Sequence, residues 1–322
     1  MKAAVYYETG GTEVFRYEEI PDPTCQPDGV TIEVQAISIE GGDVLNRAGG
    51  DMASRPHVVG YQCAGVIREV GSEVRDREPG QRVVAVMTHG SHAERVAVQS
   101  IATWVLPDGL DLERGACVPI AFGTADDCLF EFGHLREGES VLVHAGGGGV
   151  GMAAIQLAHR AGATVLSTAS TDEKLDRLKA LGLDHGINYR ETDFVSRARE
   201  LTGGRGVDLV VDSIGGETLT GSVAATAYRG RVVSVGNAGR DAARPDLGLL
   251  SPGNRTLTGV HFGVELMLNT GRVWPMVQAH LEAAASGDLE IVIDRSFRLS
   301  EAAAAHAFIE SRQAFGRVLL VP

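Results

Sequence analysis

Residues 141–151 read Val141-Leu142-Val143-His144-Ala145-Gly146-Gly147-Gly148-Gly149-Val150-Gly151, so an apolar strand ends directly in a run of glycines. The segment 152–158 that follows favours a helix. Gly146, Gly148 and Gly151 fit the pattern G-x-G-x-x-G, which allows a tight turn, close backbone approach to a pyrophosphate and close helix–strand packing. A glycine-rich surface loop is the alternative. Because a strand precedes the glycines and a helix follows them, we predict a dinucleotide-binding turn with the phosphates at the helix N-terminus.

The end of the next predicted strand, 163–169, indicates which dinucleotide is bound. It lacks the acidic residue that holds the ribose 2′-hydroxyl in NAD-binding proteins, and leads instead into Ser170 and, one helical turn later, Lys174. A hydroxyl and a cation suit a 2′-phosphate, so these residues favour NADPH over NADH. Asp172 and Glu173 argue against a strongly positive pocket, and Lys174 could equally be a solvated helix lysine.

Composition limits the partners of this chain. With 322 residues, of which 44% are hydrophobic, it is a globular protein long enough for two domains. The formal net charge of −13 argues against nucleic acid or an anionic membrane as a partner, because phosphate binding needs clustered basic residues. No apolar run reaches membrane-spanning length, and the first residues do not resemble a signal peptide. We therefore expect a cytoplasmic protein that acts on a small molecule.

The cysteines and histidines do not form a recognisable metal or disulfide pattern. His89 and His92 lie in a predicted turn before the strand 95–98, and two histidines are too few for a metal site. The cysteines contain no C-x-x-C pair, so we expect them to pack in the interior rather than form disulfides or bind zinc. These are Cys25, Cys63, Cys117 and Cys128.

Hydrophobic patterning divides the chain into two parts. The first third contains short alternating segments separated by glycine and proline, which predicts a compact antiparallel β domain. Its strands are expected at 3–7, 30–36, 65–70, 82–87 and 95–98. From residue 141, strands and helices alternate, which predicts a parallel sheet with helices on both faces. The strands are expected at 141–144, 163–168, 207–212 and 230–235, and the helices at 149–161, 172–181, 193–202 and 216–228. A helix at 301–312 and a strand at 317–321 end the chain.

These features together resemble the medium-chain dehydrogenase/reductase superfamily, specifically its zinc-free quinone oxidoreductase branch, along essentially the whole chain. Besides the glycine turn, the matching segments are 47–49, 60–66, 135–143, 230–237 and 316–318. The resemblance implies an α/β protein with a GroES-like β-rich catalytic domain, residues 1–122 and 265–322. It also implies a Rossmann domain, a doubly wound parallel sheet that binds NADPH, over residues 123–264.

The resemblance also bears on the chemistry. Zinc-dependent alcohol dehydrogenases of this superfamily carry a cysteine ligand and a Gly-His-Glu ligand motif, but the corresponding segments here are 38–43 and 60–62, which contain neither. Without a Lewis acid, oxidation of simple alcohols is disfavoured. What remains is hydride transfer from NADPH to a quinone or to the β-carbon of an α,β-unsaturated carbonyl, such as an enone, enal or enoyl thioester. A catalytically quiet NADPH-binding protein is a further alternative, since a nucleotide fold does not prove turnover.

Family resemblance assigns the cofactor contacts residue by residue. It maps the pyrophosphate contacts onto Gly148, Gly149, Val150 and Gly151, beside Gly146 of the glycine pattern. Ser170, Lys174 and Tyr189 map onto the 2′-phosphate, Thr124 onto the nicotinamide, and Gly236, Asn237 and Arg317 onto further cofactor contacts. The alternatives are a half-buried aromatic at a strand end for Tyr189, a plain helix residue for Thr124 and an exposed strand charge for Arg317.

The acceptor side departs from the family pattern. Many members have an Asn-x-x-Asp turn where this chain has Glu40, followed by two glycines and Asp43. A carboxylate there could accept a hydrogen bond or, if burial raised its pKa, donate a proton, but it could also be a solvated loop acid. Asp126 stands where an aromatic residue often occurs, and either it or Asp127 would line the pocket while the other faces solvent. Tyr61 is a candidate proton donor or pocket wall, with structural packing as the alternative.

Two further expectations come from the resemblance. Family members usually pair through the last edge strand of the nucleotide domain, here predicted at 256–262, so we expect a homodimer. The segment 247–254 is expected to overhang the acceptor pocket. Nothing in the sequence identifies the acceptor molecule.

Overall fold

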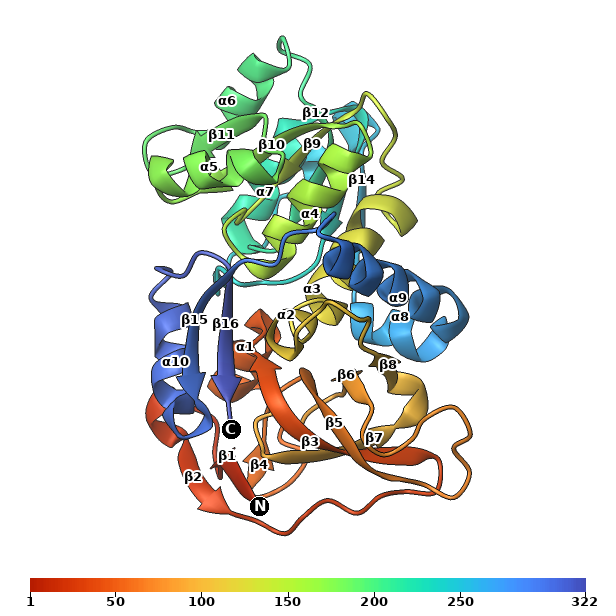
Figure 1. Cartoon of the computed structure of the whole chain (residues 1–322). Coiled ribbons are helices and arrows are strands. Elements are labelled where there is room, and N and C mark those ends of the chain that lie inside the picture. The colour runs from red at the N-terminus through yellow and green to blue at the C-terminus, as the bar shows by residue number, and fades with distance from the viewer. The chain divides into compact units, whose positions relative to one another are not determined.

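The computed structural model describes residues 1–322 and divides into two compact units. Unit 1 comprises Met1–Ile120 and Gly271–Pro322, and unit 2 comprises Ala121–Thr270. Unit 1 contains two sheets and unit 2 contains one, and each unit has its own hydrophobic core (Figure 1).

Unit 2 is built on a six-stranded sheet in which all neighbouring strands run parallel. The strand order is β11-β10-β9-β12-β13-β14. These strands are β9 (Ser140–Val143), β10 (Thr164–Ala169), β11 (His185–Asn188), β12 (Val207–Asp212), β13 (Thr226–Ser234) and β14 (Thr256–Gly259). The chain builds outward from β9 to β11 and then returns to the other side of β9. The carboxyl ends of β9 and β12 therefore form the switch point at which such sheets bind nucleotides.

Helices connect the strands of unit 2 and confirm the predicted doubly wound arrangement. They are α4 (Gly149–Arg160), α5 (Asp172–Leu178), α6 (Phe194–Leu201) and α7 (Gly216–Ala225), while α8 (Phe262–Leu268) follows the last strand, β14. Parallel crossovers are right-handed, so α4 and α5, which lead outward, cover one face of the sheet. The connections α6 and α7 cover the opposite face, where they pack against each other.

The prediction for unit 2 needs three corrections. The helix predicted over 216–228 ends at Ala225, because Thr226 already pairs with Val207 in the sheet and Arg229 has a φ of 60°. The strand predicted over 256–262 ends at Gly259, and α8 begins three residues later. Strand β11 was not predicted, because only Ile187 of its four residues is buried and the segment has no alternating pattern.

Unit 1 contains two sheets and confirms the predicted β-rich domain. The larger sheet has seven strands in the order β15-β16-β3-β5-β6-β8, with β7 also paired to β3, and the smaller one has the order β2-β1-β4. The strands are β1 (Lys2–Tyr6), β2 (Arg16–Glu19), β3 (Gly29–Ser38), β4 (His57–Val58), β5 (Gln62–Val70), β6 (Arg82–Val86), β7 (Arg95–Gln99), β8 (Thr103–Val105), β15 (Ile293–Arg298) and β16 (Arg317–Val321). All pairs are antiparallel except β15 with β16.

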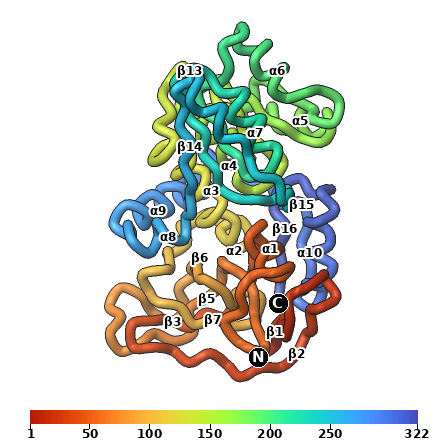
Figure 2. Tube along the Cα trace, turned by 180° about the vertical axis from the view of Figure 1, so that it is seen from behind, coloured from red at the N-terminus to blue at the C-terminus, as the bar shows by residue number.

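The C-terminal segment completes unit 1. Strand β16 pairs with β3, with Leu319 opposite Ser38. Figures 1 and 2 both show β15 and β16 beside α10, and both chain ends lie in this unit. The helices of unit 1 are α1 (Gly41–Gly49), α2 (Leu112–Gly115), α9 (Thr270–Ser286) and α10 (Ala302–Glu310), while α3 (Pro119–Asp126) crosses the unit border and continues as a π-helical turn at Asp127–Glu131. Short 3₁₀ turns occur at Thr12–Val14, Ser100–Ala102, Lys179–Leu181, Leu247–Leu249, Ser251–Gly253 and Leu299–Glu301.

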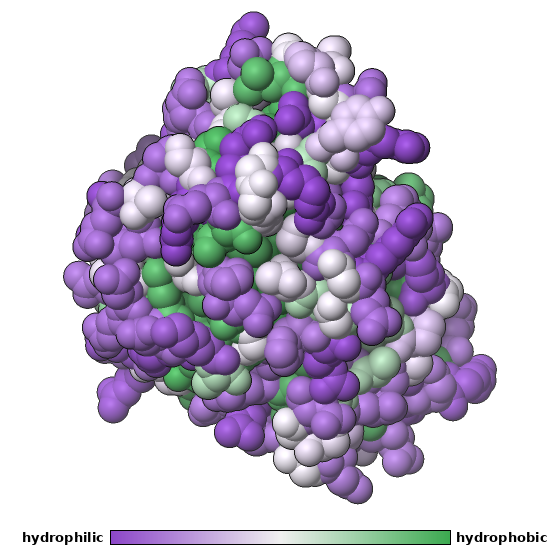
Figure 3. All heavy atoms as spheres, turned by 90° about the horizontal axis from the view of Figure 1, so that it is seen from above, coloured by the Kyte–Doolittle hydropathy of each residue, from purple (hydrophilic) through white to green (hydrophobic).

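Most of the cysteines lie in the interior, as the sequence predicts. All four cysteines are free thiols, and the predicted interior position is confirmed for Cys63, Cys117 and Cys128, whereas Cys25 is partly exposed. On the face that Figure 3 shows, hydrophobic residues form small patches between polar ones. None of the helices combines the length and apolar character needed to cross a bilayer.

A pair of histidines lies inside unit 1. His92 and His306 are both fully buried, and their Nε2 atoms are 3.1 Å apart, so only one of the two nitrogens can carry the proton between them. Burial lowers the pKa of His92 to about 3. Burial also lowers the pKa of His306 well below its usual value, and His92 and Arg47 add to that effect. Both imidazoles are therefore neutral in the folded protein at pH 7.

This pair makes unit 1 sensitive to acid. Below the unfolded pKa of about 6.5, the unfolded chain takes up protons that the folded chain does not, so the stability falls as the pH drops toward 3. We expect His92→Gln to reduce the slope of the unfolding free energy against pH by about 1.4 kcal/mol per pH unit in this range. Urea titration followed by tryptophan fluorescence measures it, because Trp104 and Trp274 both lie in unit 1. The exposed His134→Gln is the control, and equal slopes for wild type and His92→Gln would contradict the prediction.

Candidate functional site

The glycine turn lies at the switch point of unit 2, between β9 and α4. Its tightness depends on Gly151, because a Cβ there would lie 2.3 Å from the Ala145 carbonyl oxygen and 2.8 Å from the Gly146 Cα. The Gly148 N–H donates to the same Ala145 oxygen at 2.9 Å. Helix α4 begins at Gly149, and no side chain caps its N-terminus. The free N–H groups of the first turn can therefore bind an anion such as a pyrophosphate.

The residues predicted to bind the 2′-phosphate follow two neighbouring strands. Ser170 comes after β10 and Tyr189 after β11, and the last paired residues of these strands are Ala169 and Asn188. The Tyr189 N–H donates to the Ala169 oxygen at 3.2 Å, which keeps the two strand ends together. Tyr189 is 42% exposed, which fits both a ligand contact and the alternative of a half-buried aromatic at a strand end.

Lys174 belongs to the first turn of α5, at the same edge of the sheet. Its backbone N–H donates to Thr171 Oγ1, which caps the helix. The neighbouring Asp172 accepts a hydrogen bond from the Asn188 amide at 3.1 Å. Asp172 is one of the two acidic residues that argued against a positive pocket, and this hydrogen bond engages its carboxylate with Asn188. Ser170, Lys174 and Tyr189 therefore all follow the ends of β10 and β11, at one edge of the sheet.

The remaining predicted residues of unit 2 lie in α3 and after β13. Thr124 is buried in α3, and Asp126 ends that helix in a partly buried position. Asp127 is fully buried, so neither aspartate is simply solvent-facing as expected for one of them. Gly236 and Asn237 are exposed beyond the end of β13. They follow the strand next to β12, on the edge that carries the glycine turn.

Unit 1 contains a buried ion pair between two predicted site residues. Arg317, the first residue of β16, pairs with Glu40, which follows β3 and caps α1. The Arg317 guanidinium also donates to Ser38 Oγ at 2.6 Å and to the Ile39 carbonyl at 3.1 Å. Gln62 donates to the same Glu40 oxygen and accepts from the Ile120 N–H at 3.1 Å. Glu40 is 5% and Arg317 8% exposed, which excludes a solvated loop acid and an exposed strand charge.

Asp43 lies next to this pair but is compensated differently. Its Oδ2 accepts from the Glu40 backbone N–H at 2.8 Å, while its buried Oδ1 has no hydrogen-bond partner. Burial raises the pKa of Asp43 well above its usual value, Glu40 raises it further, and the Glu40 N–H opposes the rise. For Arg317, Glu40 raises the pKa against the opposing effect of burial, so the guanidinium stays charged. Burial also raises the pKa of Glu40, and Arg317 and Gln62 oppose that rise, so the pKa of both carboxyl groups lies above its usual value.

Tyr61 completes the cluster in unit 1. Its hydroxyl donates to the Gly42 carbonyl at 3.3 Å, and a Cβ at Gly42 would lie 2.4 Å from the tyrosine ring. Burial raises the pKa of Tyr61 to about 12, with Asp43 and Glu40 adding to the rise. The structure therefore brings Glu40, Asp43, Tyr61 and Arg317 together within unit 1. Their partners Ser38 and Gln62 were not predicted as site residues, although both stand in the segments that lack the zinc ligands.

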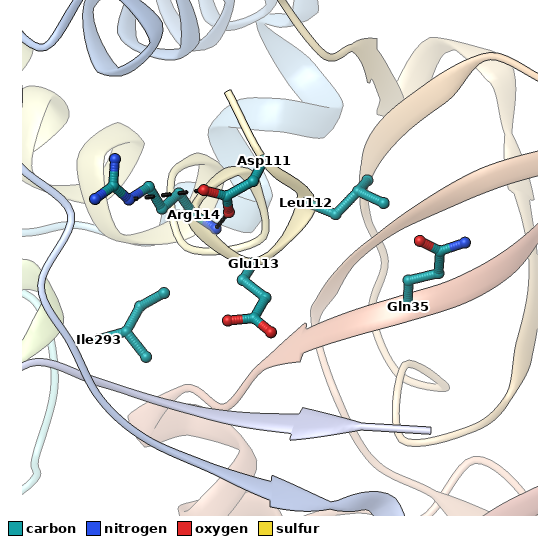
Figure 4. Close-up of a pocket in the computed structure, with 6 residues that line it drawn as sticks. All are labelled: Gln35, Asp111, Leu112, Glu113, Arg114 and Ile293. Carbon is teal, nitrogen blue, oxygen red and sulfur yellow. Dashed lines mark hydrogen bonds and ion pairs between the residues drawn. The ribbon is translucent and has the colours of Figure 1, made fainter. Parts of the chain in front are cut away.

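A separate hollow in unit 1 has a volume of about 320 Å³. Figure 4 shows its lining, which consists of Gln35, Asp111, Leu112, Glu113, Arg114 and Ile293. Arg114 and Asp111 contact each other, and the lining includes none of the predicted site residues. The candidate site residues therefore form two groups, the buried cluster of unit 1 and the nucleotide edge of unit 2.

Comparisons with known proteins match this picture. Residues 26–108 match the model of the alcohol dehydrogenase GroES-like domain, which confirms the predicted β-rich fold. Residues 149–279 match the model of the zinc-binding dehydrogenases, which does not include the segments 38–43 and 60–62. A 2-haloacrylate reductase from Burkholderia sp is 33% identical over 332 residues, covering 99% of this chain and 98% of that protein.

Two solved structures are similar over the whole chain. The quinone oxidoreductase of Pseudomonas syringae pv. Tomato DC3000 has a TM-score of 0.94 at 30% identity, covering 100% of this chain and 99% of that one. The quinone oxidoreductase of Escherichia coli in complex with NADPH has a TM-score of 0.95 at 28% identity, with 100% of both chains covered.

The buried ion pair of unit 1 can be tested by removing its cation. Arg317→Met leaves the Glu40 charge buried without its partner, so we expect the free energy of unfolding to fall by about 3–5 kcal/mol. The double variant Glu40→Gln/Arg317→Met has no buried charge left and is expected to recover part of this loss. Urea unfolding followed by tryptophan fluorescence measures both. Arg197→Met breaks an exposed ion pair and, as the control, should change stability by at most about 1 kcal/mol. A loss no larger than in this control would refute the role of the pair.

Proposed function

Since the chain belongs to the quinone oxidoreductase branch of the medium-chain dehydrogenase/reductase superfamily, we propose that it transfers a hydride from NADPH to a quinone without the help of zinc. It is an NADPH-dependent oxidoreductase of this superfamily. The observation that carries the proposal is the edge of unit 2, where an uncapped helix N-terminus follows a glycine turn and Ser170, Lys174 and Tyr189 follow the next two strands.

The residues of unit 2 fit NADPH. The space beside Ala145 exists only because Gly151 has no Cβ, and the N–H groups that begin α4 have no side-chain cap. These donors would hold the pyrophosphate, as in other doubly wound sheets. Ser170, Lys174 and Tyr189 would hold the 2′-phosphate, and Thr124, Gly236, Asn237 and Arg317 would add further contacts. When bound, NADPH supplies the hydride, and the protein supplies position and electrostatics.

We propose that the cluster of unit 1 handles the acceptor. Reduction of a conjugated acceptor places negative charge on an oxygen, which needs a proton or a hydrogen-bond donor. Asp43 is buried with Oδ1 unpaired and favours its protonated form, so it is the proposed proton donor. Tyr61 is a second donor, while Glu40 is already engaged by Arg317 and Gln62 and is proposed to hold the cluster in place. Asp126, at the end of α3 in unit 2, is a further proposed catalytic residue.

A second reaction uses the same residues. The 2-haloacrylate reductase that is similar over the full length of this chain favours reduction of an activated carbon–carbon double bond. Quinones and α,β-unsaturated carbonyls both delocalise the charge of the incoming hydride onto an oxygen, so one cluster of donors could serve either. A protein that binds NADPH without turnover is the third candidate.

We further propose a cytoplasmic homodimer. Strand β14 is the outer strand of the six-stranded sheet, and it pairs only with β13 within the chain. A second copy could continue the sheet at this edge.

The cofactor preference is tested at Lys174. Loss of a charge-assisted hydrogen bond to the 2′-phosphate should raise the KM for NADPH of Lys174→Ala by about 10-fold to 100-fold. The KM for NADH should not change, because NADH has no 2′-phosphate. Steady-state kinetics with both cofactors measure the ratio. Lys179→Ala, which removes a surface lysine paired with Asp176 near the end of the same helical segment, is the matched control. An equal loss for NADPH and NADH would contradict the assignment.

Turnover decides between the candidate functions. We expect the protein to oxidise NADPH in the presence of an aromatic ortho-quinone or an α,β-unsaturated ketone, assayed in parallel, with NADH as comparison and with products identified. Asp43→Asn keeps an acceptor for the Glu40 N–H but removes the acidic proton. It should lower kcat by about 100-fold and leave the Kd for NADPH unchanged.

Asp51→Asn, at an exposed aspartate just after α1, is the control for this variant. Tight NADPH binding with no turnover of either acceptor would favour the binding protein. Turnover that Asp43→Asn leaves unchanged would remove Asp43 as the proton donor while leaving the reductase intact.

A further inference from the structure

Unit 2 contains a buried chain of polar side chains that the reaction does not use directly. His144 follows β9 and is 3% exposed. Its Nδ1 lies 3.0 Å from Thr168 Oγ1, and its Nε2 lies 3.0 Å from Ser222 Oγ. Ser222 in turn donates to Asp212 Oδ2 at 2.7 Å. Four side chains from β10, α7, the end of β12 and the residue after β9 therefore form one continuous chain of hydrogen bonds.

The two ends of this chain are turns at the nucleotide edge of the sheet. At one end, Asp212 Oδ1 accepts from the N–H groups of Ile214 and Gly215, at 2.8 and 2.9 Å, and so closes the turn after β12. At the other end, Thr168 Oγ1 accepts from the Ala145 N–H at 3.4 Å, in the glycine turn after β9. The Thr168 carbonyl also accepts from the Gly146 N–H at 3.0 Å.

The number of available protons fixes which group donates in each hydrogen bond of this side-chain network. Asp212 can only accept while it is ionised, so the single Ser222 proton goes to this carboxylate rather than to the Thr218 carbonyl at 3.0 Å. Ser222 Oγ must then accept from His144 Nε2–H, which leaves Nδ1 without a proton. Thr168 therefore donates to Nδ1 and accepts from the Ala145 N–H. One neutral imidazole tautomer satisfies every member, and burial lowers the pKa of His144 in support of that form while Asp212 opposes the shift.

The conformation of Ala145 indicates the role of these four hydrogen-bonded side chains. Ala145 has a φ of 53°, a region that residues other than glycine rarely adopt. This conformation points its carbonyl at the Gly148 N–H and against Gly151. A strained residue keeps such a shape only when its surroundings enforce it. The contacts from Thr168 to Ala145 and Gly146 supply that constraint.

We propose that Thr168, His144, Ser222 and Asp212 are positioning residues that hold the glycine turn in the shape that binds the pyrophosphate of NADPH. This inference rests on the proposed function, which it deepens by naming residues outside the glycine pattern that set the cofactor affinity. The turn is held from α7 and the end of β12 as well as from β10, so loss of a distant member weakens NADPH binding without any lost contact to the cofactor.

The test compares variants at both ends of the chain. Thr168→Val is nearly isosteric but lacks the hydroxyl, and we expect it to raise the Kd for NADPH by about fivefold to tenfold. Ser222→Ala, which does not touch the turn, should have a similar effect. Thr168→Ser restores the hydroxyl and should bind as the wild type does. Thr226→Val is the matched control, because the buried Thr226 hydroxyl donates to the Ser222 carbonyl and lies outside the chain. For all variants, kcat at saturating NADPH should stay within about twofold of wild type.

Two further measurements separate positioning from general damage. Adenosine 2′-monophosphate occupies the 2′-phosphate pocket but lacks the pyrophosphate, so Thr168→Val should leave its Kd unchanged even though Ser170 is two residues away. The double variant Thr168→Val/Ser222→Ala should lose no more than about tenfold, because either substitution alone already breaks the chain.

The possible outcomes are distinct. Unchanged NADPH affinity in both Thr168→Val and Ser222→Ala would overturn the inference. An equal loss for adenosine 2′-monophosphate, or a double variant whose loss is the product of the two single losses, would also overturn it. If Thr168→Val does not fold, Ser222→Ala and Thr168→Ser still decide the question. A wild-type protein that binds no NADPH would refute the proposed function itself, before any variant is compared.

Discussion

The ion pair between Arg317 and Glu40 closes unit 1. It joins the first residue of the last strand to the point where β3 ends and α1 begins, and these are separated by more than two hundred positions in the sequence. Both groups are buried, so each depends on the other for charge compensation, and loss of one would leave an uncompensated charge in the interior. Ser38, the Ile39 carbonyl and Gln62 provide further hydrogen bonds to the pair. Unit 2 satisfies the same requirement with Asp212, whose carboxylate accepts from two backbone N–H groups and from Ser222.

Asp43 differs from these compensated charges. Its neighbour Glu40 receives the guanidinium and an amide, whereas Asp43 receives one backbone N–H and keeps Oδ1 unpaired. Burial raises the pKa of both carboxyl groups, but at Glu40 the direct hydrogen bonds from Arg317 and Gln62 oppose the rise. Environments that compensate two neighbouring carboxyl groups to different extents are typical of sites in which the two groups act differently. The Glu40 carboxylate is engaged by its partners in the fold, whereas Asp43 is the carboxyl group with an unpaired oxygen.

How much the sequence could predict depends on whether the signal was local. The glycine turn was predictable because its steric requirement, the close approach of Ala145 to Gly151, is encoded in consecutive residues. The Rossmann order followed from alternating strands and helices, although β11 was too short and too polar to be recognised and the end of α7 depended on the pairing of Thr226 with Val207. The burial of Arg317 was not predictable, because a strand-end arginine has no local signature of its partner. The same holds for the chain from Thr168 to Asp212, whose members belong to four different elements.

Ser38 and Gln62 show how an absence in the sequence becomes a positive feature in the structure. They stand in the two segments where zinc-dependent relatives carry metal ligands, and the sequence alone indicates only that those ligands are missing. In the fold, Ser38 accepts from Arg317 and Gln62 donates to Glu40, so both side chains are engaged in a protein-derived ion pair. The Arg317 guanidinium is permanently charged, and it donates through Nε and one terminal nitrogen to these acceptors. An acceptor that delocalises charge through its own conjugation requires less from such a site, since a hydrogen-bond donor or a proton is sufficient. Ser38 and Gln62 therefore join these two segments through one buried ion pair that requires no metal ion for its own charge balance.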